Sequence, residues 1–411
     1  MDNVTHTLIG TLLGETIART TRPDEHGLPA EVRRNLLVSA SAAGSNLPDI
    51  DLFYSAFGGK VNFLLQHRGH SHTIVGVLVL AAVAFASARW WLARRGARPA
   101  ARDLVWAAGI LLVAPLLHVG MDFTNSYGVH PFWPLYNGWL YGDAVFIVEP
   151  LFWAACAPLV FTLRTRAARF IVAALLALAV ALAFFSGFVP LTAAFALTTM
   201  TVALLLLARR VSPRISLATG VAVWAVVTAT FAASSHVAAR RAESLARNVF
   251  PEARLLDHVL TPMPANPLCW EVMLVQTQDD AVAVRRAMLA LAPSLIPADR
   301  CLSRSLNTHT APLERVPAAD APAVKWYGEI ATPISQLARL VATDCETAAA
   351  MRFIRAPWIA ILERATVLGD LRYDREKTLG FAELRLQDPP VRCPKWVPGW
   401  RPPRADLLRQ G

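Results

Sequence analysis

The sequence predicts a mostly α-helical protein, with a polytopic membrane domain of about eight helical segments followed by a smaller α+β domain. Hydrophobic residues make up 55% of the 411-residue chain and charged residues only 17%, which is unusual for a soluble enzyme. Several apolar runs reach the roughly 18 to 20 residues that a helix needs to cross a bilayer. After Ser235 the composition changes. We therefore expect a helical membrane domain at residues 1–236 and an extracytoplasmic α+β domain at residues 237–411.

Two short helices are expected first, at residues 2–19 and 33–43. Gly10 and Gly14 lie four residues apart in the first helix, and such a small-residue face suits close helix packing in a membrane. Pro48 breaks the chain after the second helix, because proline disfavours helix at the residue before it. Longer apolar segments follow as expected spans, at residues 73–92, 104–121, 145–163, 170–189, 191–208 and 215–235.

The arginine residues indicate the orientation of these segments. Arginine-rich turns at residues 19–34, 94–102, 164–169 and 209–214 fall at alternate helix ends. Because cytoplasmic loops carry an excess of Lys and Arg, one topology can place all of these turns in the cytoplasm. That topology places the N-terminus and the C-terminal domain outside the cytoplasm. The net charge of +10 then reflects topology and does not indicate nucleic-acid binding.

The C-terminal domain mixes predicted helices with strands. Helices are expected at residues 238–248, 280–291 and 333–341, the last with Thr332 as its N-cap. Residues 270–276 alternate like a strand. Residues 358–371 fit either a strand or a helix, although residues 367–373 fit better as a turn and strand.

Cysteine usage bears on the compartment of this domain. Four of the five cysteines lie in it, at Cys269, Cys301, Cys345 and Cys393. They permit two disulfides in an oxidising compartment, which agrees with an extracytoplasmic location. The same four cysteines could equally be reduced residues with a structural role, because the sequence does not distinguish the two states.

Polar donor groups gather at the helix ends opposite the arginines. They occupy residues 2–6, 46–51, 67–72 and 118–149. The densest group holds His67, His70 and His72, and neutral imidazole nitrogen is the commonest transition-metal ligand in proteins. A polar loop before a membrane span is the alternative interpretation. The convergence of all the groups on one side favours a metal site.

Within these groups, spacing points to particular ligands. His118 and Asp122 are four residues apart on one helix and so share a face, where they can bind one metal or act as a ligand and its orienting partner. Asp49 lies in an Asx-rich turn, which taken alone is better explained by turn formation than by metal binding. The predicted metal ligands are His6, Asp49, His67, His72, His118, Asp122, His130 and Asp143, with His70 as a rival to His72.

Imidazoles and carboxylates without thiolates suit Zn²⁺, Mn²⁺ or Fe²⁺. The predicted ligands outnumber those that one tetrahedral ion requires, so there is room for one or two ions. Glu149 is a functional candidate because an ionisable residue inside an apolar run is costly. Arg68 can bind a phosphate or another anion beside the metal, or it is simply a basic residue at the membrane interface.

The chain resembles a known family in a series of short motifs. These are Asp2-x-x-Thr5-His6, Asn46-x-Pro48-Asp49-x-Asp51, His67-Arg68-Gly69-x-Ser71-His72, His118-x-x-x-Asp122 with Asn125-Ser126-Tyr127-Gly128, and Tyr141-Gly142-Asp143 to Glu149-Pro150. In this order they resemble the YdjM-like family of bacterial inner-membrane metal-dependent hydrolases, over roughly the first 165 residues. At His70-Ser71-His72 the sequence departs from many relatives, which leaves open whether His70 or His72 is the ligand.

The resemblance implies a reaction class. The family is distantly similar to zinc-dependent phospholipases C, which implies phosphoester hydrolysis with helix-borne His and Asp ligands. We therefore expect a hydrolase acting at the outer face of the inner membrane, with membrane lipids as partners and a small-molecule or lipid phosphoester as substrate. Asp49 or Glu149 is the expected ligand or general base, with Arg68 as a further catalytic residue. Neither the substrate nor the oligomeric state follows from the sequence.

Two other functions compete with this one. A non-enzymatic membrane protein would have a structural metal site and a partner-binding C-terminal domain. An ion transporter needs ionisable residues near the bilayer midplane, and the apolar parts of residues 170–235 contain none.

Overall fold

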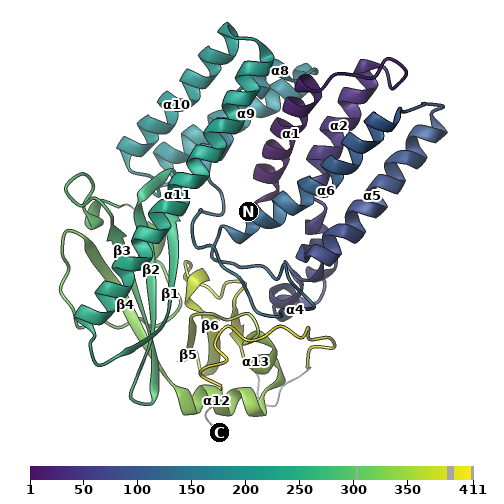
Figure 1. Ribbon diagram of the computed structural model, residues 1–411. Helices are drawn as coiled ribbons and strands as arrows, with labels where there is room; N and C mark the ends of the chain where they lie inside the picture. The colour runs from purple at the N-terminus through teal and green to yellow at the C-terminus, as the bar shows by residue number, and fades with distance from the viewer. Residues whose placement is uncertain (302–303, 387–392, 409–411) are drawn as a thin grey trace. The chain divides into compact units, whose positions relative to one another are not determined.

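The computed structural model describes residues 1–301, 304–386 and 393–408, and it confirms the predicted fold class (Figure 1). The chain forms two compact units. The first unit comprises Met1–Ile50, His70–Phe123 and Phe146–Thr230. The second unit comprises Asp51–Gly69, Thr124–Val145 and the described residues from Phe231 onward. Two short segments of the N-terminal half therefore fold with the C-terminal half.

The first unit is helical. Among the described residues, five helices are long and apolar enough to cross a membrane. Their bounds are Ile74–Arg94 (α5), Ala101–Phe123 (α6), Arg166–Phe185 (α9), Leu191–Arg210 (α10) and Pro213–Val249 (α11), the last extending into the second unit. The predicted spans at 73–92, 104–121, 170–189 and 191–208 agree with these helices to within a few residues. These five helices are the candidate membrane spans.

The two short N-terminal helices, α1 (Asn3–Thr20) and α2 (Ala30–Gly44), pack closely as predicted. A Cβ atom added at Gly10 would lie 2.8 Å from the Ser41 carbonyl oxygen, and one at Gly14 would lie 2.9 Å from Ser41 Cβ. The Ser41 hydroxyl donates to the Gly10 carbonyl at 2.6 Å. Glycine is therefore required for this approach.

The expected span at 145–163 is wrong. The chain instead forms two short helices, α7 (Pro150–Ala155) and α8 (Leu159–Thr162). Pro158 separates them, because proline has no amide hydrogen to donate and restricts the residue before it. By contrast, the helix expected at 238–248 is continuous with the preceding span in α11, since neither glycine nor proline interrupts the join.

The second unit contains two antiparallel sheets. The first has the order β1-β2-β3-β4, formed by Arg254–Met263, Asn266–Gln278, Ala281–Ala290 and Val324–Pro333. The second has the order β5-β6-β7, formed by Pro357–Leu362, Ala365–Asp370 and Glu383–Arg385. The strand predicted at 270–276 lies within β2, and residues 358–371 form the β5–β6 hairpin, so the strand interpretation is confirmed there.

Two predictions in this unit are wrong. Residues 280–291 form strand β3 and not a helix, because they pair with β2 on one side and β4 on the other along their whole length. Helix α12 (Ile334–Thr343) is not capped by Thr332. The Thr332 hydroxyl instead accepts a hydrogen bond from the Ile359 amide at 3.2 Å, which ties β4 to β5.

The core of the second unit incorporates the segment between the first spans. Helices α3 (Leu52–Ser55), α4 (Gly59–Gln66) and α13 (Cys345–Ala350) complete this unit. Leu64 and Leu65 of α4 lie in one buried cluster with Trp358 and Trp400. The Trp400 indole donates to the Leu65 carbonyl at 2.9 Å.

The cysteines of this unit form the two disulfides that the sequence permits. They join Cys269 to Cys301 and Cys345 to Cys393. Cys156 is buried in the first unit as a free thiol.

Candidate metal centre

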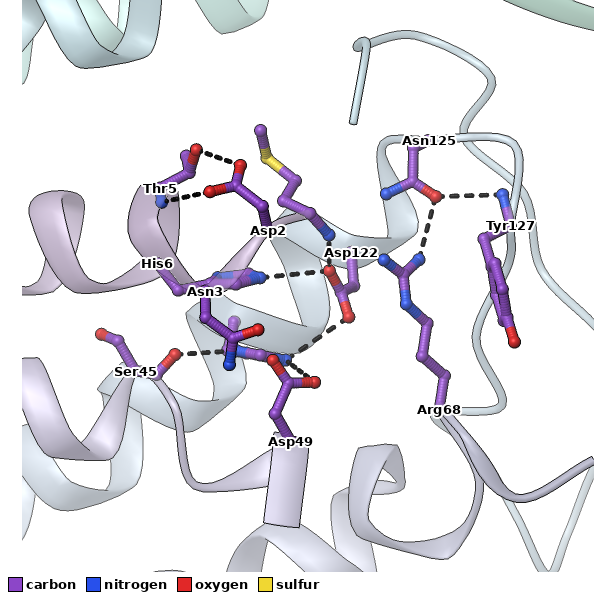
Figure 2. A network of polar contacts seen from close by, with 12 residues as sticks. Asp2, Asn3, Thr5, His6, Ser45, Asp49, Arg68, Asp122, Asn125 and Tyr127 are labelled. Atoms are coloured by element: carbon purple, nitrogen blue, oxygen red, sulfur yellow. Dashed lines mark hydrogen bonds and ion pairs between the residues drawn. The ribbon is translucent and has the colours of Figure 1, made fainter. Parts of the chain in front are cut away.

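Four buried side chains of the first unit form a compact donor group. Asp49 comes from the 3₁₀ turn η1 (Pro48–Asp51), and His72 from the 3₁₀ turn η2 (His70–His72). His118 and Asp122 come from the end of α6, where their spacing places them on one face as predicted. Each residue offers one ligand atom, and these atoms all lie within 4.8 Å of one another. Figure 2 shows Asp49 and Asp122 converging from different elements.

The separations within this group match the edges of a tetrahedral metal site. His72 Nε2 lies 3.1 Å from His118 Nε2, 3.2 Å from Asp122 Oδ2 and 3.4 Å from Asp49 Oδ1. His118 Nε2 lies 3.4 Å from Asp122 Oδ2 and 3.5 Å from Asp49 Oδ1. Ligands at the usual 2.0–2.1 Å from a tetrahedral ion are about 3.3 Å apart. The residues present therefore fit a divalent ion.

A backbone carbonyl sets the tautomer of His118. Its Nδ1 donates to the Ser45 carbonyl oxygen at 2.7 Å. Since a carbonyl only accepts, Nδ1 carries the proton and Nε2 presents its lone pair to the donor group. Metal-binding histidines are commonly oriented by such a second contact. The Ser71 hydroxyl lies 3.1 Å from His72 Nδ1 and can play the same part there.

Electrostatics at Asp49 also suit a cation. Burial alone would raise the pKa of its carboxyl group. The neighbouring His118 and His72 imidazoles outweigh that effect and hold the pKa below its ordinary value. Asp49 is therefore a carboxylate, the form that binds metal.

His6 lies beside this group. Its Nε2 is 3.2 Å from Asp122 Oδ1 (Figure 2). Its ring stacks on His118 with a centroid separation of 3.7 Å. The amino group of Met1 also contacts Asp122 Oδ1. Asp2 caps α1 by accepting from the Thr5 amide at 2.9 Å. The predicted ligand His6 thus contacts a member of the four-residue group directly.

Residues 1–190 match the model of the YdjM inner membrane protein family. Over these residues the chain is similar to that family. This confirms the predicted family, and all four donors lie within the matched residues. No curated protein and no solved structure matches the chain significantly. Together with the apolar helices, the match makes this a multi-pass inner membrane protein.

Within the matched residues, His70 and His72 differ in their positions relative to the donor group. His72 belongs to the donor group and is fully buried, whereas His70 is half-buried and outside it. The turn that presents them packs against α5 at Gly76, where an added Cβ would lie 2.1 Å from the His70 carbonyl oxygen. Only glycine permits that approach.

Glu149 has a local structural role. It is buried and precedes α7, where its carboxylate accepts a hydrogen bond from the Leu151 amide at 3.0 Å. It therefore caps the short helix that replaces the expected span. Helix α7 in turn supports α1, because the Trp153 indole donates to the Thr5 hydroxyl at 2.7 Å.

His67 and Arg68 belong to the second unit, although the family match includes them. Asp51 binds both residues there. Its carboxylate lies 3.2 Å from His67 Nδ1 and accepts from the Arg68 amide at 2.8 Å. The buried Arg68 guanidinium donates to Asn125 Oδ1 at 2.9 Å and lies over the Tyr127 ring, 4.7 Å from its centroid (Figure 2).

His130 and Asp143 also lie in the second unit, where each has other partners. The His130 ring packs against Trp139 and Trp400, with centroid separations of 3.8 and 4.0 Å. Asp143 forms a buried ion pair with Arg355 at 2.9 Å. Burial nevertheless raises the pKa of Asp143 above its ordinary value.

Sequence reasoning missed two contributors to the centre, Ser45 and Trp153. Ser45 acts through its carbonyl group, which every residue possesses, so its side chain gives no signal. Trp153 acts through the packing of α7 against α1. A hydropathy pattern does not indicate which helices pack together, so it gave no signal for this residue.

Proposed function

We propose that this protein is a membrane-bound metal-dependent hydrolase whose ion binds within the group formed by Asp49, His72, His118 and Asp122. The observation that carries this is the set of donor separations of 3.1–3.5 Å. Two imidazoles and two carboxylates without thiolate suit Zn²⁺, with Mn²⁺ and Fe²⁺ as alternatives. When bound, such an ion lowers the pKa of a coordinated water and polarises a phosphoryl oxygen.

The roles of the four residues can be divided by their surroundings. Catalytic zinc keeps a position open for water, whereas four protein ligands close a tetrahedral site. His118 and Asp122 are held on α6, and His72 is fully buried. Asp49 sits on a short 3₁₀ turn and is the most exposed of the four, at 6%. We assign His72, His118 and Asp122 as permanent ligands and Asp49 as the carboxylate that takes the proton from the attacking water.

The substrate class rests on the resemblance to zinc-dependent phospholipases C, which favours a phosphoester, including that of a lipid. Arg68 is the proposed anion-binding residue, because a guanidinium matches phosphate geometry. Glu149 is less suited to act as a base, since its carboxylate caps α7. The arginine-rich turns and the two disulfides support an N-terminus and C-terminal domain outside the cytoplasm.

Elemental analysis of the purified protein, followed by a screen of phosphomonoesters and phosphodiesters, tests this function. Wild-type protein should contain a divalent metal and hydrolyse a phosphoester. Asp122→Asn should lose both metal and turnover. His26→Ala, which changes an exposed histidine, should keep both. Wild-type protein that folds without metal in metal-replete medium would rule the proposal out.

A structural metal site in a non-enzymatic protein is the second candidate, favoured by the presence of four protein donors in one group. Asp49→Asn separates the two. The hydrolase predicts that this variant keeps substantial metal and loses turnover. The structural site predicts that metal and thermal stability are lost together and that wild-type protein has no turnover.

A further inference from the structure

A groove of about 760 Å³ lies on the first unit, away from the four donors. It runs between α9 and α10, which lie side by side, with α8 at one end (Figure 1). Its volume is within the range of 300–1,000 Å³ that is typical of small-molecule sites.

One wall of the groove is made of small side chains. Helix α9 contributes Ala173, Ala177 and Ala181, which are four residues apart and so share one face. The opposite wall on α10 carries larger apolar side chains such as Leu205 and Leu206.

Two threonines in the lining add no polar character. The Thr198 hydroxyl donates to the Ala194 carbonyl and the Thr201 hydroxyl to the Leu197 carbonyl, both at 2.8 Å. Because these hydroxyls are bonded within their own helix, the lining is apolar up to its end.

One end of the groove carries a cation. Arg209 lines it, and its guanidinium lies over the Phe161 ring of α8, with Cζ 5.3 Å from the ring centroid. Within the described part of the chain, Arg209 forms no ion pair with a carboxylate. An apolar groove that ends in an uncompensated guanidinium is complementary to a molecule with an apolar tail and an anionic head.

The length of the groove matches one leaflet. From Thr198 to Arg209 the lining advances 11 residues along α10, or about 16 Å at 1.5 Å per residue. The hydrocarbon core of a bilayer is about 30 Å thick, so one leaflet contributes about half of that. The geometry points to an anionic phospholipid as the occupant, with an acyl chain along α9 and α10 and its phosphate on Arg209. In the proposed topology this is a lipid of the cytoplasmic leaflet.

Native mass spectrometry of the full-length protein in detergent tests this site, with phosphatidylglycerol and zwitterionic phosphatidylcholine as the added lipids. Wild-type protein should retain phosphatidylglycerol in preference to phosphatidylcholine. Arg209→Gln should reduce the preference by about ten-fold, the loss expected for one charged hydrogen bond. Ala177→Phe should fill the groove and displace the bound lipid of either kind.

Matched controls lie next to each test residue. Arg210 is exposed at the same end of α10 but does not line the groove, and Ala174 is exposed on α9 outside it. Arg210→Gln and Ala174→Phe should therefore bind lipid as the wild type does. Size-exclusion chromatography and thermal unfolding establish that each variant is folded, and Arg209→Gln tests the site even if Ala177→Phe does not fold.

Three outcomes would overturn the inference. They are an unchanged preference in Arg209→Gln, lipid retention in folded Ala177→Phe, and a wild-type dimer that Ala177→Phe dissociates. The last would assign the groove to a helix of a second copy. Metal content is measured in the same samples, so a failure of this inference is distinguishable from a failure of the proposed hydrolase.

Discussion

His118 shows how one backbone atom determines the chemistry of a side chain. The Ser45 carbonyl oxygen accepts a hydrogen bond from Nδ1 at 2.7 Å, so the proton stays on Nδ1 and Nε2 faces the three other residues of the donor group. The spacing of His118 and Asp122 predicted their common face, since that depends only on helix periodicity. The contact with Ser45 depends on how α2 and α6 pack, so no local pattern predicts it.

Substituting His72 and His70 one at a time should show which of the two histidines is a metal ligand. His72→Ala removes one of four clustered donors, so we expect metal affinity to fall by more than about 100-fold, beyond the loss typical of an orienting residue. His70→Ala should leave metal affinity nearly unchanged, because His70 lies outside the donor group. Metal-to-protein ratios after dialysis against graded chelator measure both. Equal losses in the two variants would refute the assignment of His72.

A second residue-scale prediction concerns pH and the second unit. Burial, together with the neighbouring Asp374 carboxylate, raises the pKa of Glu383 to about 7. The folded state then binds more protons than the unfolded state between about pH 4.5 and 7. The stability of this unit should therefore be greatest below that window and fall as pH rises through it.

Glu383→Gln should remove this pH dependence, because the amide is neutral throughout. At pH 8 the variant should melt about 3 °C or more above wild type. Thermal unfolding from pH 5 to pH 8 measures the difference. Parallel curves for wild type and variant would contradict the raised pKa.

Among the elements, α1 and α2 link packing to the metal centre. A Cβ at Gly10 would lie 2.5 Å from Ser45 Oγ and 2.8 Å from the Ser41 carbonyl oxygen. Overpacking of this kind costs about 1–3 kcal/mol. To relieve this clash, Ser45 must move, and its carbonyl group orients His118. Gly10→Ala should therefore lower both the melting temperature and the metal affinity.

Gly109→Ala is the matched control for Gly10→Ala, since nothing lies within 4 Å of a Cβ added there. It should keep wild-type metal affinity and melt at or slightly above the wild-type temperature. Chelator titration and thermal unfolding report the two quantities. Normal metal affinity in Gly10→Ala would show that the packing of α1 against α2 does not influence metal binding.

Other elements show where local patterns fail. Residues 281–290 contain several good helix formers, yet pairing with β2 and β4 makes them a central strand. Residues 145–163 are apolar enough for a span, yet Pro158 divides them into two short helices. In both places the local sequence pattern predicted the wrong element.

At the scale of the whole molecule, the two units are interleaved along the chain. Residues 51–69 and 124–145 leave the helical unit and fold with the C-terminal sheets. Four of the five cysteines are paired in this second unit, which leaves Cys156 as the free thiol. Disulfides of this kind persist in oxidising compartments.

Counting thiols tests the proposed compartment. Protein extracted from cells under denaturing, non-reducing conditions should add one maleimide-polyethylene glycol at Cys156, and five after reduction. Cys156→Ser should add none before reduction. Five additions without reduction would place the second unit in a reducing compartment and contradict the proposed topology.

Removing one bridge should also weaken the second unit. The Cys269–Cys301 bridge closes a separation of 32 residues, for which chain entropy predicts a contribution of about 3 to 4 kcal/mol. The double change Cys269→Ser and Cys301→Ser should therefore lower the melting temperature, measured by thermal unfolding without reductant. An unchanged melting temperature would show that the bridge contributes little.

The sequence by itself determined five of the six expected long spans, the resemblance to the family and the four polar groups that supply donors. These are properties of composition and short spacing, which act within a few residues. Only the tertiary structure decided that His72 rather than His70 joins Asp49, His118 and Asp122, and that Ser45 orients His118. Those outcomes depend on contacts between residues far apart in the chain, because a metal site forms where separate turns and helix ends converge.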